Sequence, residues 1–117
     1  MSGRQSLRRE EAGFQIMRLL ERDPNLSQRE LADSVGLSLG GVNYILRALI
    51  ARGLVKLGNF RASEHKGRYA YILTPLGAVE KAIIARRFLE LKLAEYEALE
   101  REIRELNAEV LGVRGAD

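Results

Sequence analysis

The side chains best suited to recognition chemistry lie in one short segment, residues 38–50. Arranged as an α-helix, this segment has an apolar face and a second face that points outward. The apolar face contains Val42, Ile45, Leu46, Leu49 and Ile50, and the outward face contains Leu39, Gly40, Asn43, Tyr44 and Arg47. Asn43 can pair with the edge of an adenine, Arg47 can contact a guanine or a phosphate, and Tyr44 offers a ring and a hydroxyl. Because an α-helix fits the major groove of B-DNA, the segment predicts recognition of duplex DNA.

A pair of glycines, Gly40 and Gly41, falls in the first turn of this predicted helix, just after the candidate N-cap Ser38. Each glycine costs up to about 1 kcal/mol of helix stability relative to alanine, so something should offset the loss. One explanation is close approach of the backbone to DNA, with amides donating to a phosphate at the positive end of the helix. The other is that Gly41 lets this helix pack closely on the preceding one. We favour the DNA contact for Gly40, and both explanations stay open for Gly41.

Two further helices are predicted before this one. The first covers residues 8–22, where apolar side chains recur every three or four residues, and it ends before Pro24. The second begins at Ser27, whose hydroxyl can accept the amide of Glu30 while the Glu30 carboxylate accepts the amide of Ser27. It stops at Gly36, and the third helix stops at Gly53. The apolar residues of the second helix are Leu31, Ala32 and Val35. Two helices joined by a few residues around a glycine form a helix-turn-helix.

A β-hairpin with a basic tip is predicted after the third helix. Residues 54–57 and 69–73 are rich in β-forming side chains, and the polar segment between them contains Arg61, His65, Lys66 and Arg68. The three Arg and Lys residues could reach flanking phosphates or the minor groove, and Gln28 is a further candidate for a DNA backbone contact. A lone histidine is a weak metal ligand, and we expect His65 to contact phosphate or solvent.

The basic residues near the N-terminus are interpreted differently. Arg4, Arg8 and Arg9 form a basic arm that could touch the DNA backbone. We favour the alternative, in which they are simply a solvated charged end of the chain.

One long helix is predicted from Pro75, which follows the cap residue Thr74, to about Val110. At 1.5 Å per residue it would be about 54 Å long, which is too long to lie along a domain of this size, so we expect it to project. Apolar residues recur along its later part at spacings of three and four, typical of a coiled-coil seam. The seam contains Leu89, Leu93, Tyr96, Leu99, Ile103, Leu106 and Val110. It predicts a homodimer, and the alternative is a helix that folds back on its own domain.

Charge and composition limit the function classes. The 117 residues contain no Cys and one His, so a disulfide framework, a Cys nucleophile and a His-rich metal cluster are excluded. No Ser/His/Asp set is evident, and the glycine-rich segment 36–41 lacks the Lys-Ser/Thr of a phosphate loop. We therefore expect neither an enzyme nor a bound metal or cofactor.

The charge is distributed unevenly along the sequence. Residues 1–73 contain 12 Lys and Arg against 7 Asp and Glu, whereas residues 74–117 contain 7 Lys and Arg against 9 Asp and Glu. A basic first part fits an approach to phosphates, although a chance asymmetry would look the same.

No apolar run approaches the length of a membrane span, and the polar N-terminus is not followed by an apolar signal core. We therefore expect a cytoplasmic protein with no membrane partner.

Four segments resemble the winged-helix domain of MarR-type bacterial transcription regulators. They are residues 26–32, 41–49, 52–55 and 71–77, with sequences LSQRELA, GVNYILRAL, RGLV and YILTPLG. The resemblance covers about residues 10–110 and is closest to the subgroup associated with exopolysaccharide gene clusters. It implies a dimeric DNA-binding repressor or activator, with the third helix in the major groove and the wing alongside. The chain departs from the family in ending with one long helix where the family has a multi-helix dimerisation region, and a small-molecule effector stays open.

The expected fold is mainly α with a small β wing. Residues 1–73 would be a winged helix-turn-helix DNA-binding domain, residues 74–110 a dimerisation helix and residues 111–117 a frayed tail. The function expected from this fold is sequence-specific binding of double-stranded DNA by a homodimer. The alternative is a protein-interaction module that docks a partner through the long helix, with residues 39–47 forming part of the contact. The basic wing favours DNA, because a protein-docking domain does not need it.

Overall fold

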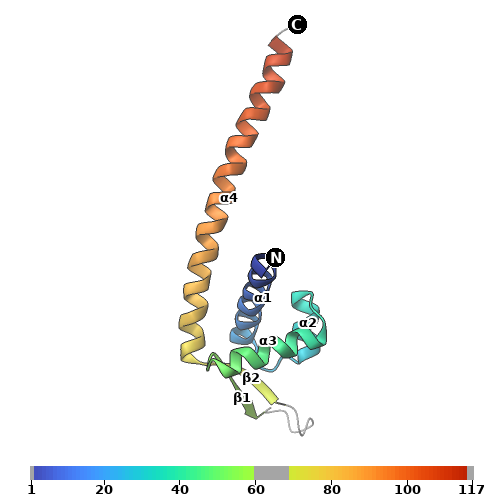
Figure 1. Cartoon of the computed structure of the whole chain (residues 1–117), viewed down its shortest axis with the longest axis vertical. Helices are drawn as coiled ribbons and strands as arrows, with labels where there is room; N and C mark the ends of the chain where they lie inside the picture. The colour runs from blue at the N-terminus through green and yellow to red at the C-terminus, as the bar shows by residue number, and fades with distance from the viewer. Residues whose placement is uncertain (1, 60–68, 116–117) are drawn as a thin grey trace. The chain divides into compact units, whose positions relative to one another are not determined.

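The computed structural model describes residues 2–59 and 69–115, with side chains described for residues 8–58 and 69–112. The elements are α1 (Ser2–Arg22), α2 (Gln28–Val35), α3 (Leu39–Ala51), β1 (Val55–Asn59), β2 (Tyr69–Leu73) and α4 (Pro75–Gly115) (Figure 1). The predicted class, mainly helical with a small β wing, is confirmed. The chain forms two compact units, Met1–Ile84 and Ala85–Asp117, so the first unit includes the beginning of α4.

The first helix is longer than the sequence predicts. We expected it to begin at Arg8, whereas α1 begins at Ser2. The prediction was wrong because it followed the apolar stripe, which marks only the part that packs in the core, from Ala12 onward. Residues such as Gln5 and Leu7 have good helix propensity and continue the helix beyond that part. Arg4 and its basic neighbours therefore belong to a helix and not to an extended arm.

The turn between α2 and α3 has the predicted capping groups. Ser27 Oγ accepts the amide of Glu30 at 3.0 Å, and Glu30 Oε1 accepts the amide of Ser27 at 3.0 Å, which completes the capping box. Gly36 ends α2 with a left-handed φ of 71°, a conformation that glycine adopts without strain. The chain then bends, and α2 and α3 lie at 105° to each other, as in a helix-turn-helix. Val35, expected in the core, is only half-buried.

The predicted hairpin is present as an antiparallel pair of strands, in which Val55 lies opposite Leu73 and Asn59 lies opposite Tyr69. The first strand begins one residue later than predicted. Leu54 still belongs to the turn that ends α3, because its amide donates to the Leu49 carbonyl at 2.9 Å. Its own carbonyl accepts the amide of Thr74 at 3.0 Å, which ties the end of α3 to the start of α4.

The start of α4 is held against the rest of the first unit. Thr74 Oγ1 accepts the amide of Gly77 at 3.0 Å, as expected of an N-cap, and also donates to the Gly53 carbonyl at 2.6 Å. Lys81 forms an ion pair with Glu21 of α1 at 2.6 Å. At the other end, α4 continues to Gly115, five residues beyond the predicted end at Val110. A single interior glycine, Gly112, lowers helix stability by only about 1 kcal/mol and does not stop the helix.

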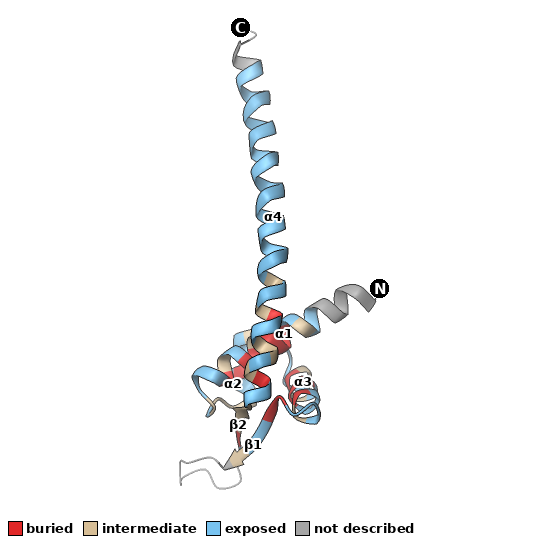
Figure 2. Ribbon diagram, turned by 90° about the vertical axis from the view of Figure 1, so that its left-hand side faces the viewer, coloured by how far each residue is buried: buried red, intermediate tan, exposed pale blue. Residues whose placement is uncertain are grey.

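The core of the first unit lies where α1, α2, α3, the wing and the start of α4 meet (Figure 2). The largest fully buried side chains are Ile16, Met17, Leu20, Leu31, Val42, Leu46 and Val55. Within the described residues, no single helix is long and apolar enough to cross a membrane; α2 and α3 reach that length and apolarity only when taken together across their bend.

Candidate nucleic-acid interface

Helix α3 has the two faces that the sequence predicts. Its core face contains Val42, Ile45, Leu46 and Leu49, all of them buried, whereas Ile50, also expected on this face, is only half-buried. On the opposite face Gly40 and Arg47 are exposed, Leu39 is 49% exposed and Tyr44 is 60% exposed. The α3 surface of the first unit therefore presents one hydrophobic side chain, one phenol and one guanidinium, spaced along about two helical turns.

The structure at the N-terminus of α3 gives a reason for a glycine at position 41 but not at position 40. Ser38 Oγ accepts the amide of Gly41 at 3.0 Å, which makes Ser38 the N-cap. A Cβ atom on Gly41 would lie 3.2 Å from that hydroxyl and 3.7 Å from Leu37 Cβ, so Gly41 leaves room for its own cap. The atoms near Gly41 belong to the turn, and the suggestion that this glycine allows close packing on α2 is not supported. A Cβ atom on Gly40 would enter open space, so packing within the described residues does not require a glycine there.

Asn43 is half-buried, and its side chain is linked to α2 directly and to β2 through Gln28. Asn43 Nδ2 donates to Gln28 Oε1 of α2 at 3.4 Å, and Gln28 Nε2 donates to the Tyr71 hydroxyl of β2 at 2.8 Å. The Gln28 amide, which the sequence suggested for the DNA backbone, thus has a protein partner at each end. Tyr71 was missed as a site residue, because its separation of 43 residues from Gln28 leaves no local signal in the sequence.

Arg9 is the second residue that sequence reasoning did not place at this surface. Its guanidinium carbon lies 5.4 Å from the centre of the Tyr44 ring, within the range of a cation–π interaction. Both side chains are exposed, so this interaction puts a positive charge beside the outward face of α3.

The other basic candidates differ in their surroundings. Arg47 is exposed on α3, whereas Arg52 at the end of α3 forms an ion pair with Glu80 at 3.4 Å. The predicted contacts at the tip of the wing, Arg61, Lys66 and Arg68, lie outside the described residues, as does His65.

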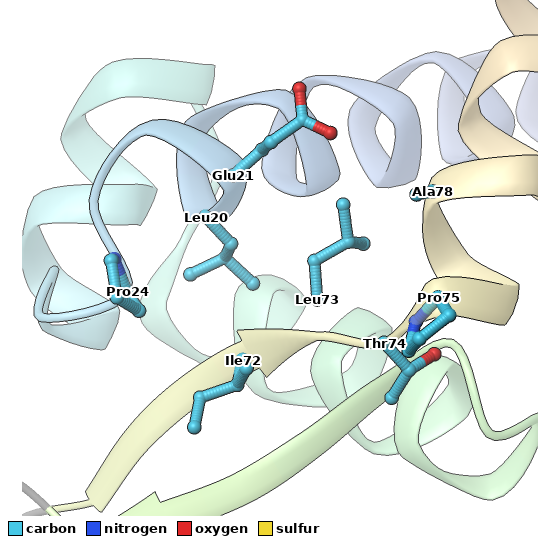
Figure 3. Close-up of a pocket in the computed structure, with 8 residues that line it drawn as sticks. All are labelled: Leu20, Glu21, Pro24, Ile72, Leu73, Thr74, Pro75 and Ala78. Carbon is cyan, nitrogen blue, oxygen red and sulfur yellow. The ribbon is translucent and has the colours of Figure 1, made fainter.

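An open pocket lies on another part of the first unit. It is lined by Leu20, Glu21, Pro24, Ile72, Leu73, Thr74, Pro75 and Ala78, which come from the end of α1, the following turn, β2 and the start of α4. Figure 3 shows Leu20 and Leu73 between α1 and β2, with the Glu21 carboxylate directed away from the strands. That carboxylate is the one charged group in the lining, and Lys81 already pairs with it.

The predicted seam residues of α4 are all exposed, each by between 49% and 62%. They are Leu89, Leu93, Tyr96, Leu99, Ile103, Leu106 and Val110. Every described side chain from residue 89 to residue 112 is exposed. Sequence reasoning did not include Leu91 and Leu111 of the second unit, or Leu76, Val79 and Ile83 at the start of α4, which are also exposed.

Residues 9–56 match a family model described as winged helix-turn-helix DNA-binding. The chain carries a winged helix-turn-helix domain. In this winged helix-turn-helix, α3 occupies the position of the recognition helix, and β1 and β2 form the wing.

Solved structures of MarR-family regulators have the same fold. A point mutant of S. aureus MepR has a TM-score of 0.64 at 17% identity, over 92% of this chain and 77% of that one. The PcaV regulator from Streptomyces coelicolor has a TM-score of 0.62 at 20% identity, over 86% of this chain and 79% of that one. Staphylococcus aureus MarR, in complex with salicylate and kanamycin, has a TM-score of 0.55 at 22% identity, over 70% of this chain. The chain spans only about half of that MarR protein, 53%.

No curated protein matches the sequence. The family model describes a DNA-binding domain over residues 9–56, and these solved structures share its fold.

Proposed function

We propose that this protein is a homodimeric transcription regulator that binds double-stranded DNA in a sequence-specific manner. The observation that carries the proposal is the outward face of α3, in which Tyr44 and Arg47 are exposed on the side opposite the buried face. A winged helix-turn-helix inserts this helix into the major groove, where base edges differ in their donors and acceptors.

The roles of the α3 residues follow from their chemistry. Arg47 is suited to two acceptors of a guanine, Asn43 to an adenine edge, and Leu39 to apolar contact with a thymine methyl group. Ser38 and Gly40 stand at the positive end of the helix, where a phosphate is stabilised, and the open space at Gly40 allows the DNA backbone to come close.

Contacts that do not depend on sequence would come from basic residues around this helix. Arg9, held over the Tyr44 ring, is positioned for a phosphate beside the groove. Arg61, Lys66 and Arg68 of the wing would contact flanking phosphates.

Dimerisation is proposed through the seam of α4. Seven large apolar side chains at three- and four-residue spacing, all about half exposed, form a surface that monomers in water rarely leave uncovered. A second copy of the same helix offers a matching seam, with charged residues such as Glu100 and Arg104 beside it.

The decisive experiment measures binding to random-sequence duplex DNA as a function of salt. Six to ten phosphate contacts would reduce affinity by roughly 10³- to 10⁵-fold between about 50 and 200 mM salt. We expect such a steep dependence for the full chain. A flat response would contradict DNA binding and would favour the alternative, a module that docks a partner protein through the exposed face of α4.

The sequence resemblance also leads us to propose that the regulated genes belong to an exopolysaccharide cluster and that the protein acts in the cytoplasm. A reporter fused to the promoter of such a cluster should change its expression when the gene for this protein is deleted. Unchanged expression would remove this assignment and leave the proposal of DNA binding intact.

A further inference from the structure

Three polar side chains form a chain of hydrogen bonds that links the recognition helix to the wing. Tyr71 of β2 accepts from Gln28 Nε2 at 2.8 Å, and Gln28 Oε1 of α2 accepts from Asn43 Nδ2 of α3 at 3.4 Å. All three side chains are half-buried. The far end of this chain is fixed to the framework, because the Tyr71 amide donates to the Pro24 carbonyl at 3.2 Å.

We propose that Gln28 and Tyr71 are positioning residues that orient the Asn43 amide so that it reads adenine in preference to guanine. The inference rests on the proposed function, because it concerns a base contact made by α3. It gives Gln28 and Tyr71 a role in specificity that differs from contact with the DNA backbone.

The direction of the hydrogen bonds carries this argument. A side-chain amide has a donor end and an acceptor end, and either end can face a neighbour. Because Gln28 turns its NH₂ group toward Tyr71, its oxygen faces Asn43 and accepts one hydrogen of Asn43 Nδ2. Asn43 then has its oxygen and its other N–H for the groove.

One acceptor beside one donor matches adenine, which offers the N6 amino group and N7 on its major-groove edge. With the opposite direction of the hydrogen bonds, the Asn43 oxygen would face Gln28 and two N–H groups would face the groove. Two donors match guanine, which offers N7 and O6. The direction set by Gln28 therefore decides which purine position 43 prefers.

Holding the amide in one orientation before DNA arrives also reduces the conformational entropy that binding must remove. A well-placed bidentate pair discriminates between bases by about 5- to 150-fold, and we expect the wild-type preference for adenine over guanine to lie in this range.

The test uses the full chain and selection of bound duplexes from a random pool. The Asn43→Ala variant identifies the base pair that Asn43 reads, and duplexes with adenine or guanine at that position are then compared by affinity. We expect Tyr71→Phe and Gln28→Leu to reduce the adenine preference to within about threefold of unity. Tyr71→Phe removes the hydroxyl that accepts from Gln28 Nε2, and Gln28→Leu removes the oxygen that accepts from Asn43 Nδ2. In either variant the Asn43 amide is no longer held in one orientation. The salt dependence of binding should not change in Tyr71→Phe.

Gln28→Glu is the matched control. A carboxylate only accepts hydrogen bonds, so it still accepts from Asn43 Nδ2 and should keep the adenine preference. Its negative charge should weaken binding to all duplexes by a similar factor. Thermal denaturation of each variant shows that the assays are made below its unfolding temperature.

Two outcomes overturn the inference without affecting the proposed function. One is that Asn43→Ala loses the preference for adenine at that position, whereas both Tyr71→Phe and Gln28→Leu retain the full preference. The other is a wild-type preference for guanine at that position. If the wild-type protein prefers no sequence at all, the proposed function itself fails, and the inference fails with it.

Discussion

Among single residues, Gly77 and Gly40 lie in the first turns of α4 and α3, respectively, but the space around them differs. A Cβ atom on Gly77 would overlap the Leu54 carbonyl oxygen and lie 2.7 Å from Leu73 Cδ1, whereas one on Gly40 would meet open space. Gly77→Ala should therefore lower the free energy of unfolding by about 1–3 kcal/mol, because backbone cannot move aside as a flexible side chain can. Gly40→Ala should raise it by up to about 1 kcal/mol.

Urea unfolding of the two variants measures both effects, and DNA affinity separates structure from function. If the backbone at Gly40 approaches DNA closely, Gly40→Ala should bind its preferred duplex more weakly although it is more stable. Equal affinity would mean that the DNA backbone stays away from this turn.

Arg47 and Arg68 are expected to differ in what they contribute to binding. Arg47→Ala should reduce discrimination at one base pair by about 1–3 kcal/mol, because a guanidinium that contacts a base edge carries sequence information. Arg68→Ala should weaken binding to all sequences alike, because a phosphate contact carries none. Selection from a random pool checks both. An unchanged preferred sequence in Arg47→Ala would show that Arg47 does not read a base.

Among the helices and strands, α4 offers a matched pair of substitutions. Leu99→Gln with Ile103→Gln puts two polar residues on the exposed apolar seam, and Ala94→Gln with Ala98→Gln puts two on the other side of the helix. If the seam pairs with a second copy, only the first variant should become monomeric, because a coiled coil depends on its apolar seam. Light scattering measures the mass in solution. A dimer that persists in the first variant would place the interface elsewhere.

For the molecule as a whole, a twofold dimer of winged helices predicts a near-palindromic operator. Its half-sites should lie about one turn of DNA apart, roughly 34 Å. Inserting about 5 base pairs between them would turn one half-site to the other side of the duplex. Affinity should then fall to that of a single half-site, which a titration with the shifted duplex measures. Equal affinity for the shifted duplex would contradict simultaneous binding by two recognition helices.

The helices of the first unit, their caps and the strand pair could be predicted from the amino-acid sequence. Ser27, Ser38 and Thr74 cap helices through hydrogen bonds to amides three residues away, so the signal lies within a few neighbouring positions. The two faces of α3 were equally readable, because helical periodicity places Ile45 inward and Arg47 outward whatever else surrounds them. The start of α1 was misplaced because an apolar stripe marks where a helix is buried and not where it begins.

The contacts that hold the outward surface of α3 together could not be predicted, because they depend on tertiary packing. Asn43 and Tyr71 come together through Gln28, Arg9 of α1 reaches Tyr44, and Gly77 lies against Leu54. Each of these contacts joins residues that are at least 15 positions apart, and their side-chain types are common in any soluble domain. Local periodicity and capping chemistry extend over only a few residues. Such pairs are set by the packing of α1, α2, the wing and the start of α4 around one core, which exists only once the chain has folded.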